Sequence, residues 1–219
     1  MSLLSRASAL ALVPFLLVGC AQTQPQPDAA AASSAMPAPS ALPGIDLLTR
    51  SEWGAQAPVF AMTPHTPDAL TIHHTATPQR PERSPAETLR ALQRFSISSD
   101  TLDDGRPKKP WADVPYHYYI TPDGTIVEAR DVRYEGDTNT NYDLTGQVQV
   151  VVEGNFMEEE PTEAQLASLV RLAGALSERY GIPPSRVGGH RDRAVGQTSC
   201  PGDALEAHFP EVLAAMQGG

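Results

Sequence analysis

Hydrophobic positions recur at helical spacing in three segments of the chain, and helix-capping signals accompany each of them. Ser84-Pro85-Ala86-Glu87 is a capping box with proline at the first helical position. Thr162-Glu163-Ala164-Gln165 opens a second helix, which Gly181 and Pro183 close. Asp203 is expected to cap a third helix. The apolar stripes that we expect to face the core are Leu89, Leu92 and Phe95; Leu166, Leu169, Val170, Ala173 and Leu176; and Leu205, Phe209, Val212, Leu213 and Met216.

Four shorter apolar runs predict strands, at residues 69–73, 116–121, 125–129 and 147–152. Turn chemistry in Pro122-Asp123-Gly124 joins the middle two into a hairpin. Strands interspersed with helices in this order predict a single α/β domain with a central mixed β-sheet flanked by about three α-helices. The polar, breaker-rich segment 96–113 is expected to form a loop around Trp111 that borders a cleft.

Residues 1–19 have the pattern of an export signal. Arg6 supplies the positive region, and the apolar run at 9–18 is too short to span a bilayer. The run ends in Leu17-Val18-Gly19-Cys20, which resembles the lipobox of a bacterial lipoprotein and predicts a lipid on Cys20. The alternative is an ordinary secretory signal with a chance cysteine. Ala21, rather than aspartate, after the lipidated cysteine favours the outer membrane of a Gram-negative envelope, facing the periplasm.

Residues 20–43 are rich in Ala, Pro, Ser and Gln, so we expect a flexible tether there and one domain at 44–219. The chain carries 26 acidic and 16 basic residues, a net charge of −10. This balance argues against binding to nucleic acid and against electrostatic docking on anionic lipid, so membrane attachment would come from acyl chains at Cys20. No feature of the sequence encodes oligomerisation, and we expect a monomer.

Two histidines and one cysteine are candidate metal ligands. His73 ends a predicted strand, His190 lies in a glycine-flanked loop, and Cys200 precedes the third helix. A lipid on Cys20 would leave Cys200 without a disulfide partner. Catalytic zinc sites use three such protein ligands and leave the fourth position open, so the set predicts a zinc site at one edge of the sheet and a hydrolytic reaction. We expect His65 and His208, which lie in no motif, to be structural or surface residues.

Six motifs follow one another from residue 50 to residue 202. They are Arg50-Ser51-Glu52-Trp53-Gly54-Ala55, Thr71-Ile72-His73-His74-Thr75-Ala76, Val114-Pro115-Tyr116-His117-Tyr118-Tyr119-Ile120, Asp123-Gly124-Thr125-Ile126, Glu153-Gly154-Asn155-Phe156, and Gly189-His190-Arg191-Asp192 with Cys200-Pro201-Gly202. In these motifs the chain resembles the zinc-dependent N-acetylmuramoyl-L-alanine amidases of the phage T7 lysozyme and peptidoglycan recognition protein type, over essentially all of Ser51 to Leu213.

The resemblance implies that His73, His190 and Cys200 bind Zn²⁺ and that Tyr116 is the active-site tyrosine. Thr198 stands where many members have a lysine that steadies the oxyanion. His74 falls at a variable position and is expected to be structural or to contact a ligand.

The resemblance also implies the reaction, which is hydrolysis of the amide between the lactyl group of N-acetylmuramic acid and L-alanine in peptidoglycan or muropeptides. Val151 occupies a position where some bacterial relatives carry a glutamate base, so Tyr116 and Thr198 are the candidates to orient water or stabilise the tetrahedral oxygen. The strand pattern alone favours Tyr116 as a half-buried aromatic of the hairpin, and only the motif favours the active-site role. A peptidoglycan-binding protein without catalysis and a zinc peptidase acting within the stem peptide remain alternatives.

Three polar neighbours of these residues have open roles. Asp192 is expected either to orient a ligand histidine or to accept bonds from nearby backbone N–H groups. Arg191 is expected to pair with Asp192 or to meet a carboxylate of the stem peptide. His117 is expected to be a packing residue or to contact a ligand.

Overall fold

A six-stranded sheet forms the centre of the computed structural model, which describes residues 42–102 and 105–217. Its strands are β1 (Leu47–Leu48), β2 (Ala69–His74), β5 (Tyr118–Ile120), β6 (Ile126–Glu128), β7 (Gln147–Val152) and β8 (Val187–Gly189). They lie in the order β1-β6-β5-β7-β2-β8, and only the β5–β6 pair is antiparallel. The predicted hairpin, the four predicted strands and the mixed α/β sheet are therefore confirmed.

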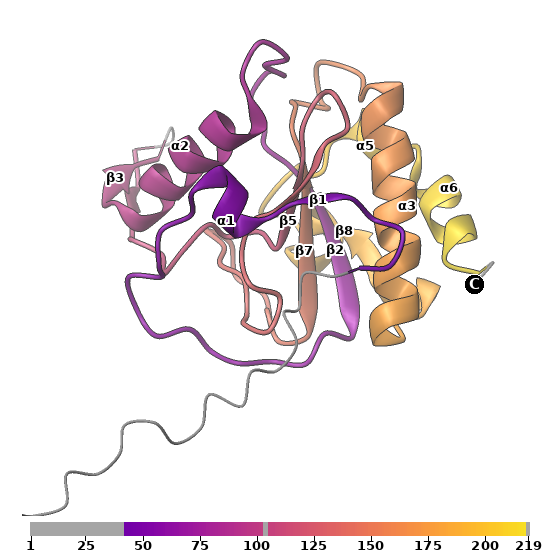
Figure 1. Ribbon diagram of the computed structural model, residues 1–219, viewed down its shortest axis with the longest axis horizontal. Coiled ribbons are helices and arrows are strands. Elements are labelled where there is room, and N and C mark those ends of the chain that lie inside the picture. Colours follow the sequence, from indigo (N-terminus) through magenta and orange to yellow (C-terminus); the bar gives the residue numbers. More distant parts are fainter. Residues whose placement is uncertain (1–41, 103–104, 218–219) are drawn as a thin grey trace, which may run out of the picture. The chain divides into compact units, whose positions relative to one another are not determined.

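The two longest helices begin at the predicted capping boxes. In α2 (Pro85–Ile97), Ser84 accepts a bond from the backbone N–H of Glu87, and in α3 (Glu163–Tyr180) Thr162 does the same for Gln165. Gly181 ends α3 in the left-handed conformation, with φ of 67°. Figure 1 shows α3 and α6 (Phe209–Ala215) on one side of the sheet, with α1 (Arg50–Trp53) and α2 on the other. The sheet is thus covered on both faces.

The third predicted helix is wrong in two respects. The segment forms two short helices, α5 (Asp203–Glu206) and α6, because Pro210 has no N–H to donate and its ring clashes with the carbonyl of the preceding turn. Asp203 is not the cap: it is the first helical residue, and its carboxylate pairs with Arg191. Phe95 in α2 is also not a core residue, since it is 40% exposed.

Several short elements escaped the hydrophobic pattern. Helix α1 begins at a capping box made by Thr49 and Glu52. The sequence contains this box, but a helix of 4 residues is too short to show an apolar stripe. The remaining elements are β3 (Asp100–Thr101), β4 (Pro107–Lys108), the 3₁₀ turn η1 (Pro184–Arg186) and α4 (His190–Arg193). Strands β3 and β4 pair antiparallel inside the segment expected to be a loop.

The two faces of the central strands have different partners. Leu70 and Ile72 in β2 join Val148, Val150 and Val152 in β7 in the main core, which packs against α3 and α6. Alternate residues of the same strands point to the face that α1 and α2 cover. Because β2, β7 and β8 are parallel, their carboxyl ends meet at one edge of the sheet, where the candidate ligands lie.

The predicted leader, Cys20 and residues 20–41 of the predicted tether lie outside the described residues, whereas Leu42, near the end of that tether, is buried in the main core. Within residues 42–102 and 105–217, no helix is both long and apolar enough to cross a bilayer.

Candidate metal centre and active site

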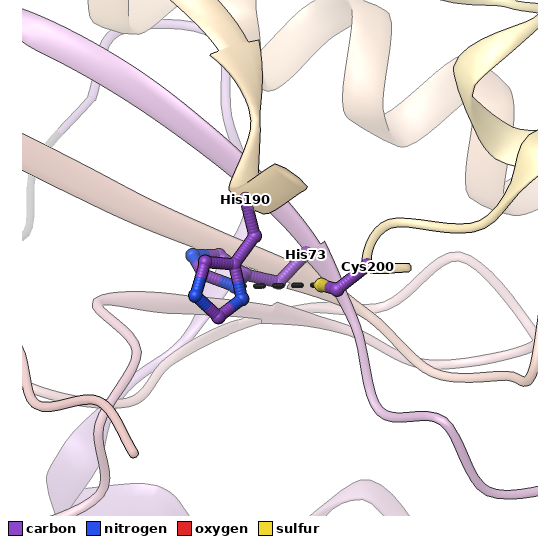
Figure 2. A group of neighbouring side chains, drawn as sticks. All are labelled: His73, His190 and Cys200. Carbon is purple, nitrogen blue, oxygen red and sulfur yellow. Dashed lines mark hydrogen bonds between the residues drawn. The ribbon is translucent and has the colours of Figure 1, made fainter. Parts of the chain in front are cut away.

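The three predicted ligands meet at the carboxyl ends of β2 and β8. His73 is the penultimate residue of β2, His190 begins α4 directly after β8, and Cys200 lies in the loop before α5. One ligand atom from each of the three side chains lies within 4.8 Å of the other two. Figure 2 shows the three side chains turned toward one another. His73 Nδ1 and Cys200 Sγ lie 3.6 Å apart.

The donor set fits a zinc ion. Two nitrogens and one sulfur are ligands that Zn²⁺ prefers, and at its usual bond lengths a tetrahedral ion separates a nitrogen and a sulfur ligand by about 3.6 Å. The Nδ1–Sγ separation of 3.6 Å matches this value. The side chains therefore need little movement to share one ion, and with three ligands a fourth position stays open.

Burial sets the protonation of the three groups. Desolvation, followed by the charge on His190, lowers the pKa of His73 well below its usual range. Desolvation also lowers the pKa of His190 to about 4, so both imidazoles are neutral and keep a lone pair at neutral pH. Burial raises the pKa of Cys200 to about 12, although the His74 backbone N–H donates to the sulfur at 3.3 Å and opposes this rise. A bound cation is what would deprotonate this thiol.

Each candidate histidine has a neutral hydrogen-bond partner that the sequence analysis missed. His73 Nε2 contacts the amide oxygen of Gln149, and His190 Nε2 lies 2.6 Å from the Thr140 hydroxyl. Gln149 is fully buried in β7, in a run where glutamine and valine alternate. That alternation, polar on one face of a buried strand, was the signal in the sequence.

A cavity of about 260 Å³ opens onto the two histidines. Tyr116 and Thr198, the predicted catalytic residues, line it together with Trp111. The rings of Tyr116 and His73 lie 5.1 Å apart. Burial, with the Cys200 and Tyr142 groups nearby, raises the pKa of Tyr116, so its phenol keeps its proton and can donate a hydrogen bond. Trp111 borders the site as the sequence predicted.

The Thr198 hydroxyl is tied to the backbone of the cysteine ligand. Thr198 Oγ1 accepts a bond from the Cys200 N–H at 3.1 Å. Because a hydroxyl both accepts and donates, this bond leaves the hydrogen of Thr198 available to the cavity. Val151, in the position of the absent glutamate, is fully buried. One carboxylate, Asp137, does line the cavity, and it is paired with Arg130.

A buried lysine holds the aromatic wall of the cavity. Lys108 Nζ donates to three backbone carbonyls, those of Ser96, Ser98 and Lys109, at 2.8 to 3.0 Å. Its ammonium also lies 4.6 Å from the centre of the Trp111 ring and 5.0 Å from that of Phe95. These contacts hold Trp111 in place beside the cavity.

A reciprocal pair of amide bonds joins the two loops beside the cavity. The Asn141 N–H donates to Gln197 Oε1 at 2.8 Å, and Gln197 Nε2 donates back to the Asn141 carbonyl at 3.1 Å. Gln197 lines the cavity one residue before Thr198. The loop that carries Thr198 is therefore fastened to the loop that carries Thr140.

The other histidines have structural bonds. His74 accepts a bond from the Phe156 N–H at 3.2 Å, and His117 accepts one from the Gln149 N–H at 2.8 Å. His65 bridges the backbone of Val132 and Gly146. His208 pairs with Glu211 near the start of α6. The expectations for His65 and His208 are confirmed.

The two charged residues that follow His190 in α4 bond to the backbone and to α5. Asp192 accepts a bond from the Gly189 N–H at 2.7 Å, so the backbone alternative is confirmed and the orientation of His190 falls to Thr140. Arg191 pairs with Asp203 at 2.7 Å and Glu206 at 3.1 Å, and its expected pairing with Asp192 is wrong.

Residues 63–203, which include the candidate ligands, match the profile of a known protein family. The profile of Amidase_2, described as N-acetylmuramoyl-L-alanine amidase, matches residues 63–203. The chain is 27% identical over 168 residues to Peptidoglycan-recognition protein SD of Drosophila melanogaster, across 74% of this chain and 83% of that protein. It is 30% identical over 141 residues to the N-acetylmuramoyl-L-alanine amidase of Homo sapiens, across 62% of this chain and 22% of the human protein.

A solved structure with the same fold is that of peptidoglycan recognition protein-LE in complex with tracheal cytotoxin, a monomeric diaminopimelic acid-type peptidoglycan. It aligns with a TM-score of 0.61 and 27% identity, across 74% of this chain and 91% of that one. The region matched by the family profile contains all three candidate ligands.

Proposed function

This chain belongs to the N-acetylmuramoyl-L-alanine amidase family, Amidase_2, and we propose that it is a zinc-dependent enzyme of that activity. Its reaction is hydrolysis of the amide between the lactyl group of N-acetylmuramic acid and the L-alanine of the stem peptide. Its substrate is peptidoglycan or a muropeptide. Support for this class of ligand comes from the relative solved with tracheal cytotoxin, a monomeric peptidoglycan.

The observation that carries the proposal is the complete ligand set beside an open cavity. His73, His190 and Cys200 converge within 4.8 Å, and the histidines line the cavity that also holds Tyr116 and Thr198. A protein that only binds peptidoglycan needs a groove, but it has no use for two neutral imidazoles and a thiol in this arrangement.

Each of these side chains has a distinct task in amide hydrolysis. When bound, zinc polarises the scissile carbonyl and lowers the pKa of a water molecule to about 7. The protonated phenol of Tyr116 donates a hydrogen bond to the oxygen on which negative charge develops, and the Thr198 hydroxyl donates a second. Donors of this kind contribute about 10²- to 10³-fold each in rate. Trp111 forms a wall against which the substrate is held.

The envelope location is a separate part of the proposal. It is supported by the sequence at Leu17-Val18-Gly19-Cys20 and by the tether that follows. We propose a lipid on Cys20, the outer membrane as the site of anchoring, and the periplasm as the compartment the enzyme faces. Labelled fatty acid should enter the wild-type chain in a bacterial host and should not enter a Cys20→Ser variant.

Product analysis tests the reaction. Muropeptides are digested with purified protein, with protein treated with a chelator, and with treated protein resupplied with zinc, and the products are resolved by mass. Free stem peptide and intact muramyl sugar, lost on chelation and regained with zinc, are the expected result. Cleavage inside the stem would instead identify a zinc peptidase. Binding without any metal-dependent product would identify a recognition protein.

A further inference from the structure

A buried amide lies directly behind one of the candidate metal ligands. Gln149 is fully buried in β7, and an amide removed from water is costly unless its polar atoms are hydrogen-bonded. Its side chain meets two partners, His73 and Tyr142. His73 is a candidate ligand and Tyr142 packs against another, His190, whereas Val148, Val150 and Val152 of β7 point to the main core on the opposite face.

The orientation of this amide and the position of the His73 proton depend on each other. The amide oxygen of Gln149 accepts a bond from His73 Nε2, which requires that Nε2 carry the hydrogen. His73 Nδ1 then keeps its lone pair, and Nδ1 is the atom that faces Cys200 Sγ at 3.6 Å. In the other tautomer the hydrogen would sit on Nδ1, and the atom facing the sulfur could not bind a cation.

Tyr142 supports the amide and touches the second histidine. Gln149 Nε2 donates to the Tyr142 hydroxyl at 2.9 Å, and the same hydroxyl lies 3.1 Å from Gln149 Oε1, the atom that contacts His73. The ring of Tyr142 also lies 5.3 Å from the ring of His190. One aromatic residue therefore contacts both Gln149, the partner of His73, and His190 itself, and it follows Asn141, which Gln197 fastens.

We propose that Gln149 is the positioning residue of His73: its amide selects the tautomer with hydrogen on Nε2 and so presents Nδ1 to the metal. The inference rests on the proposed function, because it takes His73 as a ligand. Metal-binding histidines usually donate their second N–H to such an outer partner, and removing that partner costs about 10- to 100-fold in metal affinity. Because the Gln149 amide is uncharged, the net charge of the metal centre depends on the ligands and the ion alone.

The chain offers a matched control on the same strand. Gln147 lies two residues earlier in β7 on the same face, is 8% exposed, and accepts a bond from the Thr71 hydroxyl at 2.7 Å. Its partner is not a candidate ligand. Gln147→Leu and Gln149→Leu thus remove the same group from the same face of the sheet, and only the second removes a bond to the centre.

The test reads the tautomer in the metal-free protein. Nitrogen-15 spectra of the imidazoles, with His73 assigned by the loss of its signals in His73→Asn, should show hydrogen on Nε2 in the wild type. Gln149→Leu should shift His73 toward the other tautomer, whereas Gln149→Glu, which still accepts the bond, and Gln147→Leu should not. Zinc affinity, measured by competition with a chromophoric chelator, should fall about 10- to 100-fold in Gln149→Leu only.

The outcomes separate this inference from the proposed function. Hydrogen on Nδ1 of His73 in the wild type overturns the inference without the need for any variant. The same holds if Gln149→Leu folds, keeps the wild-type tautomer and binds zinc with wild-type affinity. If the wild type binds no zinc although His73 carries its hydrogen on Nε2, the proposed function fails and the tautomer assignment stands.

Discussion

The two faces of β2 and β7 show how one pair of strands serves stability and chemistry separately. On one face, Leu70, Ile72, Val148, Val150 and Val152 are fully buried in the core beneath α3 and α6. The other face presents a different set on alternate residues, namely Thr71, His73, Gln147, Gln149 and Val151. The first face requires only apolar side chains that fill the space beneath the helices. The second buries polar groups, which are tolerable only because each has a partner.

This difference implies that a substitution on one face should spare the property that the other face provides. A hydrophobic truncation should lower the free energy of unfolding and leave the chemistry of the site in place. A change at the site should remove metal or rate and leave the fold in place, since a core of this size does not depend on the ion.

Replacing the cysteine ligand should have the largest effect. Cys200→Ser should lose most of the bound zinc, and the rate of amide hydrolysis should fall on the order of 10³-fold, because the metal supplies several kcal/mol of stabilisation. Zinc content and turnover are measured, together with the midpoint of thermal unfolding, which should change little. Ser199→Ala, at an exposed neighbour, is the control. Full activity in Cys200→Ser would show that Cys200 is not a metal ligand.

Truncating the apolar face should act on stability. Ile72→Ala removes a fully buried side chain next to His73 and should lower the free energy of unfolding by about 3 kcal/mol, within the usual range of 2–5 kcal/mol for such cavities. Denaturant unfolding measures this loss. Zinc affinity under native conditions should stay near the wild-type value. A tenfold weaker affinity would show that the two faces are coupled.

Removing the tyrosine hydroxyl should reduce rate without touching the metal. Tyr116→Phe should lower the turnover number about 10²-fold, since it deletes one donor to the developing oxyanion. The ring, which packs 5.1 Å from that of His73, is retained. Steady-state kinetics and zinc content are compared with the wild type. An unchanged turnover number would reduce Tyr116 to a packing residue.

Acid should weaken the fold through a histidine that supports the polar face. Burial lowers the pKa of His117 to about 3, so its neutral form stabilises the fold fully above pH 6.5 and this contribution is lost as the pH falls toward 3. The loss is about 1.4 kcal/mol for each pH unit. In His117→Asn, the free energy of unfolding of the metal-free chain should fall less steeply between pH 6.5 and 5. Equal slopes would mean that the pKa of His117 does not change on folding.

Elements defined by local chemistry could be predicted from the sequence. The capping boxes at Ser84 and Thr162 placed the starts of α2 and α3, and alternation or apolar runs placed the strands. Pro210 marks the break between α5 and α6, but the apolar stripe continues across it and favours a single helix. Among site residues, His73, His190 and Cys200 were found because few residue types bind zinc, and the structure brings them together.

The supporting contacts could not be predicted because they depend on tertiary packing. His73 meets Gln149 only because β2 and β7 pair in a parallel register, and no local signal defines that register. Thr140 reaches His190 from a loop fifty residues earlier in the chain. Lys108 can be buried because its ammonium donates to three backbone carbonyls. A lysine in a polar segment of the sequence does not predict this burial.

The separation of the ligands along the chain also determines when the centre can exist. His73 and Cys200 are 127 residues apart, and β2 lies between two strands that are made later, β7 and β8. A growing or unfolded polypeptide therefore holds an imidazole on one part and a thiol on a distant part, with no pocket between them. The candidate metal centre therefore forms only once β2, β7 and β8 have paired, late in the folding of the chain.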